Sequence, residues 1–184
     1  MKLARDYCGM QQRHMNIKGT FRKQAARCLA IGLLAGISLK LFAADILHIS
    51  GSSMEPGIRD GSVVLVNKLA YGIVQPFGDR LLCSWAEPAA GDIVIYLYNN
   101  KIIIKRCAAT GGTPLDYSAD KGYTLLVNNA SFPLSAEQYY TMCTIRSVPE
   151  GTILAIGDNA AVSVDSRTYG FIPVNNVLGK AVCR

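Results

Sequence analysis

"GDIVIYLYNNKIIIKRC", residues 91–107, predicts a β-hairpin. Two runs rich in Val, Ile and Tyr flank "YNNK", and asparagine tolerates the left-handed backbone that a short turn needs. Four further segments share this composition and are bounded by Gly, Asn, Asp or Pro: "SVVLVNKL" (62–69), "YTLLVNNA" (123–130), "TILAIGD" (152–158) and "NNVLGKAVC" (175–183). Together they predict an all-β fold, an antiparallel domain of barrel-like or sandwich-like form, with residues 108–156 as a small excursion from its core.

The positive charge of the chain lies in its N-terminal tail. The net charge is +6, from 19 Lys and Arg against 13 Asp and Glu. Residues 1–27 hold seven of the basic side chains and one acid, Asp6, so the rest of the chain is balanced at twelve of each sign. This balance gives the folded domain no excess charge for binding nucleic acid. A basic tail before an apolar run instead predicts a segment held in the cytoplasm, by the positive-inside rule.

Residues 28–47, "CLAIGLLAGISLKLFAADIL", follow this tail and predict one transmembrane anchor. About 17 residues precede Asp45, the low end of what spans a bilayer, and Lys40 lies near the far end, where its amine can reach the headgroups. A cleavable signal peptide is the alternative. The long basic region and the lack of a clean small-x-small site directly before Asp45 favour a permanent anchor. Residues 1–27 are then a cytoplasmic tail, and residues 48–184 form an extracytoplasmic domain.

Four cysteines fall in the extracytoplasmic part: Cys83, Cys107, Cys143 and Cys183. An oxidising compartment permits two disulfides among them in three connectivities, and reduced core cysteines are an equal alternative. The chain has no CxxC motif and no cluster of histidines. We therefore expect neither a metal site nor another cofactor.

The stretch "HISGSSMEPGI", residues 48–58, offers several serines as nucleophiles. A hydrolytic serine needs a base to take its proton, and His48 is the histidine on the extracytoplasmic side. It precedes Ser53 by five residues, roughly 16 Å in an extended chain. A local set of Asp45, His48 and Ser53 would therefore need a sharp fold-back. We expect His48 to be an interfacial or core histidine near the membrane instead.

Lysine can replace histidine as the base when burial keeps its amine neutral. "KIIIKRC", residues 101–107, places Lys105 after three isoleucines in the predicted hairpin. Alternate side chains of a strand share a face, so Lys105 and Ile103 point one way and Arg106 the other. One of the two basic side chains should face the core, while the other reaches solvent or a carboxylate. A solvated basic pair at a strand end is the plainer alternative.

A third polar stretch is "GDNAAVSVDSRTYGFIP", residues 157–173. Gly-Asp-Asn predicts a tight turn, and Asp165 and Arg167 could pair on one face of a strand. Ser163 would lie on the same face, where a hydroxyl can hold a neutral lysine by a hydrogen bond without charging it. Taken alone, this stretch is typical of a surface turn.

In combination, these stretches resemble the type I signal peptidases, the membrane-anchored Ser–Lys proteases that remove signal peptides from exported proteins. "SSMEP" matches the family's Ser-Met-x-Pro box, "GDIVIY" the next box, "KIIIKRC" the Lys-Arg box and "GDNAAVSVDSRTYGFIP" the terminal box. The four occur in family order after a membrane anchor, and the resemblance covers nearly all of residues 46–184. A match to the Ser-Met-x-Pro box alone is weak evidence for the family, whereas matches to all four boxes in this order are highly specific for it.

The resemblance implies a role for each matched residue. Ser53 is the nucleophile, whose own backbone N–H is one oxyanion donor, Lys105 is the general base, and Ser163 orients the lysine amine. The implied structural supports are Asp158, Asp165 and Arg167, the last two forming an ion pair behind the site. The residues expected around the oxyanion and the substrate are Gly51, Ser52, Met54, Pro56 and Ile103.

The resemblance also sets the expected fold, substrates and location. The family fold is an all-β core whose groove pairs with the substrate as an added strand. Its small pockets select small residues at positions −3 and −1 of the preprotein. We expect an endopeptidase of the bacterial inner membrane, with its catalytic domain in the periplasm, that acts on signal peptides of preproteins and binds no nucleic acid.

The sequence departs from the family pattern at several positions. Gly51 stands where many Gram-negative members have a serine that gives a second oxyanion donor. "AAV", residues 160–162, replaces a polar Arg-Asp-Asn, and "TGGTP", residues 110–114, departs from the usual Gly-x-Pro-Gly-Asp. The excursion is short for a Gram-negative housekeeping enzyme. Peptidases of plasmid conjugation systems have this size, so a dedicated substrate such as a pilin precursor, and partners from a secretion or conjugation apparatus, stay open.

Two other classes of protein fit parts of the sequence. A catalytically idle β domain of a secretion or conjugation complex could bind peptides in the same groove, but the presence of Ser53, Lys105 and Ser163 together speaks against it. A self-cleaving repressor of the SOS type shares the Ser–Lys chemistry and a related fold. It would need a DNA-binding helical domain, and residues 1–47 supply an anchor instead.

Overall fold

The structure is a computed structural model of the chain. It describes residues 22–75, 78, 80–120 and 122–182. Most of the basic tail and Cys183 therefore lie outside the described residues. The chain divides into two units, Met1–Lys40 and Leu41–Arg184.

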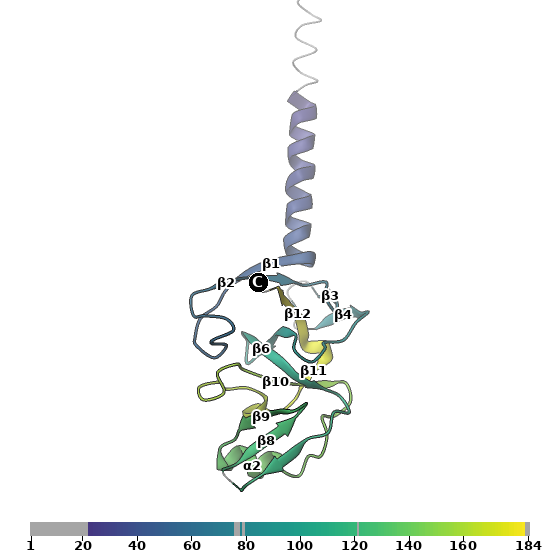
Figure 1. Cartoon of the computed structure of the whole chain (residues 1–184). Coiled ribbons are helices and arrows are strands. Elements are labelled where there is room, and N and C mark those ends of the chain that lie inside the picture. The colour runs from purple at the N-terminus through teal and green to yellow at the C-terminus, as the bar shows by residue number, and fades with distance from the viewer. Residues whose placement is uncertain (1–21, 76–77, 79, 121, 183–184) are drawn as a thin grey trace, which may run out of the picture. The chain divides into compact units, whose positions relative to one another are not determined.

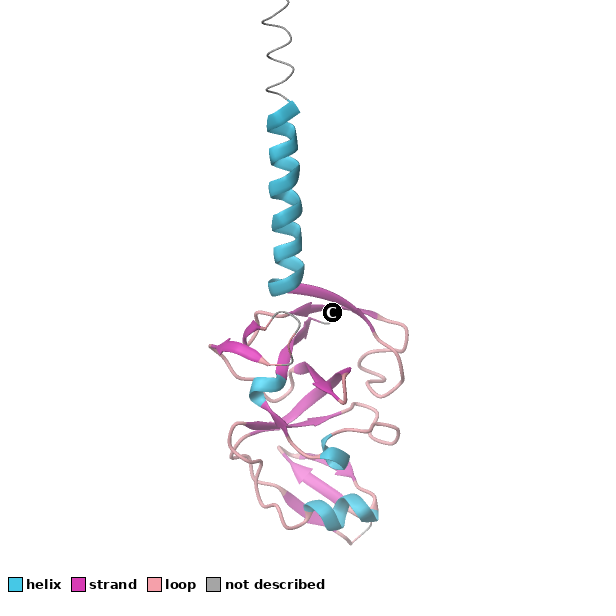
Figure 2. Ribbon diagram, turned by 180° about the vertical axis from the view of Figure 1, so that it is seen from behind, coloured by secondary structure: helices cyan, strands magenta, loops and turns pink. Residues whose placement is uncertain are grey.

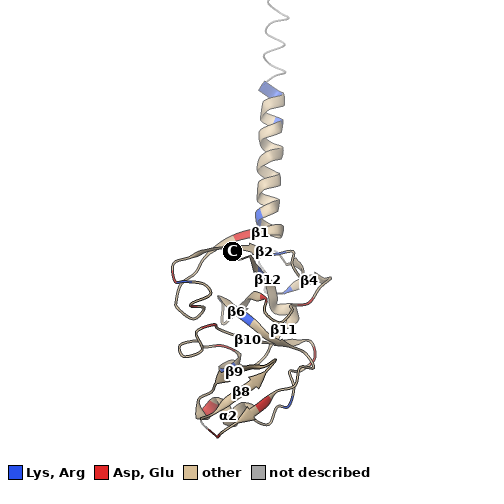
Figure 3. Ribbon diagram, viewed as in Figure 1, with Lys and Arg blue, Asp and Glu red and all other residues tan. Residues whose placement is uncertain are grey.

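One helix, Arg22–Ala43, carries the N-terminal apolar run, and its last turn, η1 (Leu39–Ala43), is π-helical. At about 1.5 Å per residue, its 22 residues extend about 33 Å, enough to cross the roughly 30 Å core of a bilayer. Basic residues lie towards both ends of the helix, with an uncharged stretch between them (Figure 3). The length and composition of this helix are those of a membrane-spanning segment.

The helix ends at Ala43, earlier than the apolar run predicts. Residues 44–47, which the sequence analysis placed in the anchor, belong to strand β1 (Ala44–His48). This strand pairs with β2 (Val63–Asn67) over all five residues, and Asp45 lies 3.5 Å from the amine of Lys68. Hydropathy could not find this boundary, because the strand that completes the pairing comes 15 residues later in the chain.

A seven-stranded antiparallel sheet forms the core of the second unit, where strands are the main regular secondary structure and long loops connect them (Figure 1 and Figure 2). The strand order is β1-β2-β12-β5-β6-β10-β11. The remaining strands of this sheet are β5 (Ile93–Tyr98), β6 (Lys101–Thr110), β10 (Thr152–Ile156), β11 (Ile172–Pro173) and β12 (Val177–Val182). The predicted antiparallel β domain is confirmed, and the segments expected to form its strands do so.

Strand β5 is central and buries both of its faces. Val94 and Tyr96 pack into one hydrophobic cluster, and Ile93 and Ile95 pack into another on the opposite face. This explains why the segment is a continuous apolar run instead of an alternation of apolar and polar residues. Strand β6 pairs with it through the predicted hairpin, with Tyr98 opposite Lys101.

The excursion between β6 and β10 is a second small structure. It contains a three-stranded sheet and one helix: β7 (Asp116–Ser118), β8 (Thr124–Val127), β9 (Ala130–Pro133) and α2 (Ala136–Met142). A capping box begins α2, since Ser135 accepts from the backbone of Gln138 and the Gln138 side chain accepts from the backbone of Ser135. The excursion is shorter than the predicted 108–156, because β6 continues to Thr110 and β10 belongs to the main sheet.

Four short elements complete the second unit: β3 (Gly72–Val74), β4 (Leu81–Ser84), α3 (Ser166–Tyr169) and η2 (Val174–Asn176). Strands β3 and β4 form a separate two-stranded sheet. The sequence analysis did not find any of these elements. Each has only three or four residues, too few to show the hydrophobic period of a helix or a strand.

We expect the β5–β6 turn to depend on Asn100. Asn99 and Asn100 both have a left-handed backbone, with φ of 49° and 58°. Replacing Asn100 with alanine should lower the free energy of unfolding by about 1 kcal/mol, because this conformation brings Cβ of an ordinary residue close to the next carbonyl oxygen. Replacing it with glycine should cause no such loss. Chemical unfolding of the detergent-solubilised chain measures both. The exposed Asn175, whose φ is not positive, is the control for an Asn→Ala exchange.

Candidate active site

The serine-rich stretch forms a closed loop between β1 and β2. The backbone N–H of Ile49 donates to the Ser62 carbonyl at 2.8 Å, which joins the two ends of the loop. Within the loop, the N–H of Ile58 donates to the Met54 carbonyl at 2.8 Å. The side chains of Met54 and Ile58 are buried in the core cluster that lies under β2 and β5. Met54 is fully buried, so it holds the preceding residue, Ser53, at a fixed position above the sheet.

Ser53 and Lys105 come together across 52 residues of sequence. The Nζ atom of Lys105 lies 2.6 Å from Oγ of Ser53, within hydrogen-bonding distance. Lys105 is in β6 opposite Val94, and the residue is only 5% exposed. Ile103, on the same face of the strand, is partly buried and packs against the core cluster of β5. Of the basic pair in the Lys-Arg box, the lysine is therefore the one that faces the interior.

Burial lowers the pKa of the Lys105 amine below its ordinary value of 10.5, because the charged form loses its hydration. The negative charges of Asp165 and Asp158 act in the opposite direction, and the positive charge of Arg167 adds to the lowering. The net effect favours the neutral amine. When Nζ is neutral, the Ser53 hydroxyl can donate its hydrogen to it, and this is the arrangement that general-base chemistry requires.

Asp165 and Arg167 form a buried ion pair. Two hydrogen bonds of 2.9 Å join the guanidinium to the carboxylate, and the side chains are 0% and 2% exposed. Burial alone would raise the pKa of Asp165, but the bonds from Arg167 and from the Gly157 backbone N–H hold it below its usual value. Asp165 also caps the N-terminus of α3 by accepting from the Arg167 backbone. The predicted pairing of these two residues is present, but it lies at the start of helix α3 and not on one face of a strand as expected.

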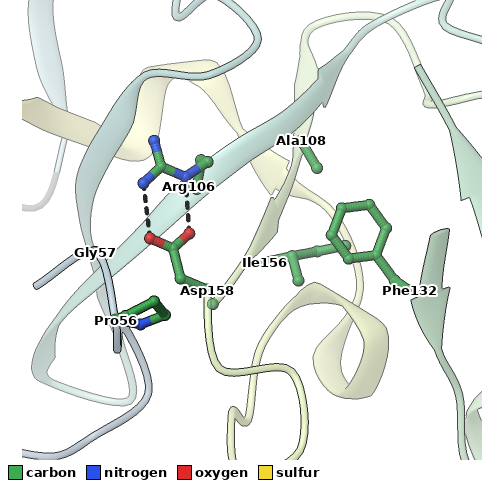
Figure 4. Close-up of a pocket in the computed structure, with 8 residues that line it drawn as sticks. Pro56, Gly57, Arg106, Ala108, Phe132, Ile156 and Asp158 are labelled. Atoms are coloured by element: carbon green, nitrogen blue, oxygen red, sulfur yellow. Dashed lines mark hydrogen bonds and ion pairs between the residues drawn. The ribbon is translucent and has the colours of Figure 1, made fainter. Parts of the chain in front are cut away.

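Asp158 pairs with the other basic residue of the Lys-Arg box. The guanidinium of Arg106 donates two hydrogen bonds of 2.7 Å to the carboxylate of Asp158 (Figure 4). Arg106 also donates to the Gly91 carbonyl at 3.0 Å. The arginine thus reaches a carboxylate while its neighbour Lys105 faces the interior, one of the two outcomes that strand alternation predicts.

Asn159 holds the backbone on which Ser53 lies. Its N–H donates to the Ser53 carbonyl at 3.1 Å, and its side-chain amide donates to the Ser52 carbonyl at 3.2 Å. The sequence analysis treated this asparagine only as part of a turn. Its position after Asp158 in the Gly-Asp-Asn motif could have suggested a role, but the partner atoms are backbone carbonyls, which a sequence pattern does not reveal.

Gly51 and Ser53 differ in how their backbone N–H groups are used. The Gly51 N–H donates to the Asp60 carboxylate at 2.8 Å, and its φ of 101° favours glycine. The Ser53 N–H has no acceptor among the described residues. In this geometry the Ser53 N–H is available to an oxyanion, whereas that of Gly51 is engaged with Asp60.

Ser163 is buried beside Gly157, but its expected hydrogen bond to Lys105 is not formed. Its Oγ forms no hydrogen bond of good geometry among the described residues, although its hydroxyl is near enough to help lower the pKa of the Asp165 carboxyl. A buried hydroxyl without a partner costs free energy, and a movement of the lysine amine towards it would relieve that cost. The structure therefore places Ser163 near the site without giving it the predicted contact.

The local set of Asp45, His48 and Ser53 is not assembled. His48 is exposed at the end of β1, so it is not a core histidine, and the Asp45 carboxylate lies 3.5 Å from the amine of Lys68. Of the cysteines that the structure describes, Cys107 is buried and Cys83 is exposed, and neither forms a disulfide. Cys143, which is partly buried, forms no disulfide either. Across the described part of the chain, no three His, Cys, Asp or Glu side chains group as a metal site would require.

Comparison with known proteins agrees with this geometry. The family model for "Signal peptidase, peptidase S26" matches residues 22–184. The chain belongs to this family. It is therefore a serine endopeptidase of the signal peptidase I type, a homologue at about one quarter identity.

The relatives are distant in sequence. A probable signal peptidase I-1 of Synechocystis is 26% identical over 174 residues, covering 89% of this chain and 82% of that protein. A signal peptidase I of Pseudomonas fluorescens is 28% identical over 186 residues, covering 78% of this chain and 65% of that protein. A crystal structure of a signal peptidase I from Enterococcus faecalis aligns with a TM-score of 0.38 at 26% identity, covering 53% of this chain and 98% of that one. The family assignment does not depend on that structural overlap.

We expect Gly157→Ala to disrupt the site. A Cβ at this position would stand 2.5 Å from the Ser53 carbonyl oxygen and still closer to Oγ of Ser163. Either the serine loop or the 157–165 segment must then move, and overpacking of this kind typically costs about 1–3 kcal/mol. Unfolding of the variant in denaturant should show this loss. An unfolding free energy equal to that of the wild type would contradict the close approach.

Lys105→Met should stabilise the fold at neutral pH. Because the pKa of Lys105 is lowered on folding, the unfolded chain binds more protons than the folded one between that lowered pKa and 10.5. The stability of the wild type therefore rises with pH across this window, and the advantage of methionine should shrink as the pH approaches 10.5. Denaturant unfolding at a series of pH values measures the difference.

The control for this exchange is Lys101→Met, which removes an exposed lysine from the same strand. Surface exchanges usually change stability by less than about 0.5 kcal/mol, and we expect that range at every pH. A difference in stability between the wild type and Lys105→Met that stays constant up to pH 10.5 would contradict a lowered pKa of Lys105.

Proposed function

We propose that the chain removes signal peptides from exported preproteins, with Ser53 as nucleophile and Lys105 as general base. The observation that carries this proposal is the 2.6 Å contact between the Ser53 hydroxyl and a buried lysine amine that burial drives towards its neutral form. A serine hydroxyl is a weak nucleophile until a neighbouring base takes its proton. A neutral amine at hydrogen-bonding distance is such a base.

The reaction then proceeds through an acyl-enzyme. Lys105 takes the proton of Ser53 as Oγ attacks the scissile carbonyl carbon, and the Ser53 N–H donates to the oxygen that becomes negative. The lysine passes this proton to the amine of the leaving product, which is the mature protein. The signal peptide stays bound to Oγ as an ester. Lys105 next takes a proton from water, the hydroxide attacks the ester, and Ser53 regains its proton as the signal peptide leaves.

The surrounding residues keep these two groups in place. The buried pair of Asp165 and Arg167 supports the segment that carries Gly157, and Asn159 holds the Ser53 backbone. Ser163 is proposed to hold the lysine amine during turnover, since its buried hydroxyl forms no hydrogen bond of good geometry among the described residues. Small residues at positions −3 and −1 of the preprotein are the proposed recognition feature.

The N-terminal helix is proposed to anchor the enzyme in the bacterial inner membrane. Its 22 residues reach across a bilayer core, and the excess of basic residues before it favours a cytoplasmic N-terminus. Residues 1–27 would then be mainly cytoplasmic, and the domain from residue 48 onwards would face the periplasm, where signal peptides of exported proteins are cleaved. A dedicated preprotein, such as a pilin precursor presented by a conjugation apparatus, is a narrower form of the proposal that the short excursion supports.

Cleavage of labelled preproteins by the detergent-solubilised enzyme tests the catalytic pair. Ser53→Ala and Lys105→Ala should each lower kcat/KM by at least about a hundredfold, as the loss of a nucleophile or a general base does. Because the pKa of Lys105 is lowered, the rate of the wild type should rise with pH and level off below 10.5. A rate that is flat from mildly acidic to alkaline pH would contradict a neutral-lysine mechanism.

The matched controls are Ser50→Ala, an exposed serine of the same loop, and Lys101→Ala, an exposed lysine of the same strand. Both should cleave at the wild-type rate. A panel of preproteins with small residues at −3 and −1 is needed, because a dedicated enzyme would cleave few of them. If a purified and folded wild type binds these preproteins without cutting any, the idle peptide-binding domain becomes the better reading.

A further inference from the structure

A cavity of about 370 Å³ lies next to the Arg106–Asp158 ion pair. One side of it is apolar, formed by Ala108, Phe132 and Ile156, and the ion pair faces these residues across the cavity (Figure 4). Pro56 and two glycines complete the lining. Arg106 and Asp158 neutralise each other through two hydrogen bonds, so the cavity carries no net charge.

This cavity lies beside the loop that carries Ser53. Pro56 and Gly57 of that loop line it, and Arg106 lines it from the face of β6 opposite to the side chain of Lys105. Gly157 also lines the cavity, and a Cβ there would touch the Ser53 carbonyl oxygen. A peptide bound at Ser53 would therefore pass close to the mouth of the cavity.

The order of residues along β6 indicates which half of a substrate reaches it. Before Lys105, Ile102 lines a different cavity of about 290 Å³, together with Asp45 and Leu47 of β1. β1 follows the proposed anchor without an intervening residue, so a signal peptide still held in the membrane would approach from the β1 side. After Lys105, Arg106 and Ala108 line the cavity of Figure 4. The mature part of the preprotein would leave on that side.

We propose that this cavity binds an apolar side chain from the first two residues of the mature part of the preprotein, and so adds a specificity determinant beyond the cleavage site. The proposal rests on the proposed function. Burying an apolar side chain against Phe132 and Ile156 removes surface from water on both partners. A charged side chain would find the Arg106–Asp158 pair already satisfied and would lose its hydration without gaining a partner.

Position-by-position substrates test this proposal. One cleavable preprotein is made with alanine, leucine or aspartate at position +1, and again at +2, and kcat/KM is measured with the full-length wild type. At one of these positions we expect leucine to exceed alanine by about tenfold, the effect of filling an apolar pocket, and aspartate to be poorer than alanine. Equal rates for leucine and alanine at both positions would overturn the proposal.

Two variants assign such a preference to the cavity from opposite walls. Phe132→Ala removes the aromatic wall on β9, and Ala108→Leu fills the cavity from β6. Each variant should bring the ratio of kcat/KM for the leucine substrate to kcat/KM for the alanine substrate close to one. The matched control is Leu126→Ala, an exposed apolar residue on the opposite face of the same three-stranded sheet, which should keep the wild-type ratio. If both cavity variants keep the full ratio, the preference has another source and the proposal fails.

The outcomes separate this proposal from the proposed function. A wild type that cleaves the alanine substrate, with Ser53→Ala inactive, supports the function whatever the leucine ratio is. If that active enzyme cleaves the leucine and alanine substrates at equal rates, the cavity proposal is overturned and the proposed function stands. If the wild type cleaves none of the preproteins, both proposals fall together.

Discussion

A buried lysine is tolerated at neutral pH when its amine can give up its proton, and every charged group around Lys105 bears on that balance. Two carboxylates lie close enough to favour the charged form, those of Asp165 and Asp158. An arginine holds each of them through two hydrogen bonds, Arg167 in one case and Arg106 in the other. Neither carboxylate forms an ion pair with the lysine, whose amine is instead next to the hydroxyl of Ser53.

This pairing explains why the site needs three separate stretches of the chain. The Lys-Arg strand supplies Lys105 and the arginine that neutralises Asp158, and the terminal stretch supplies both carboxylates and the second arginine. The serine loop must then approach the terminal stretch closely, and glycines allow this at two points. A Cβ at Gly57 would meet the Asp158 carboxylate, and one at Gly157 would meet the Ser53 carbonyl oxygen. The glycines therefore set how near the Ser53 loop can come to the segment that carries Asp158.

The sequence predicted the parts of the fold that depend on local chemistry. The Asn99–Asn100 turn is local, and the apolar run of β5 reflects burial on both faces, so this hairpin could be found without coordinates. The pairing of Ser53 with Lys105 could be proposed from four motifs in family order, because the lysine strand taken alone fits a solvated strand end equally well. Strand β1 could not be separated from the apolar anchor, because its pairing with β2 is long-range. The contacts of Asn159 were missed for the same reason, and the unpartnered hydroxyl of Ser163 shows that matching a motif does not fix a contact.

The arginine that pairs with Asp165 also connects the candidate active site to the excursion. Arg167, which neutralises Asp165, donates a 2.8 Å hydrogen bond to the carbonyl of Pro133 at the end of β9. Phe132, the aromatic wall of the cavity beside the site, is the preceding residue. A second link comes from Gln138 of α2, whose amide donates to the hydroxyl of Thr168 in α3 at 3.0 Å. Because one guanidinium neutralises a carboxylate behind the lysine and also holds the strand of Phe132, the geometry of the cavity cannot vary independently of the charge balance at Lys105. An excursion of different length or sequence would keep this link only if it kept a carbonyl within reach of Arg167.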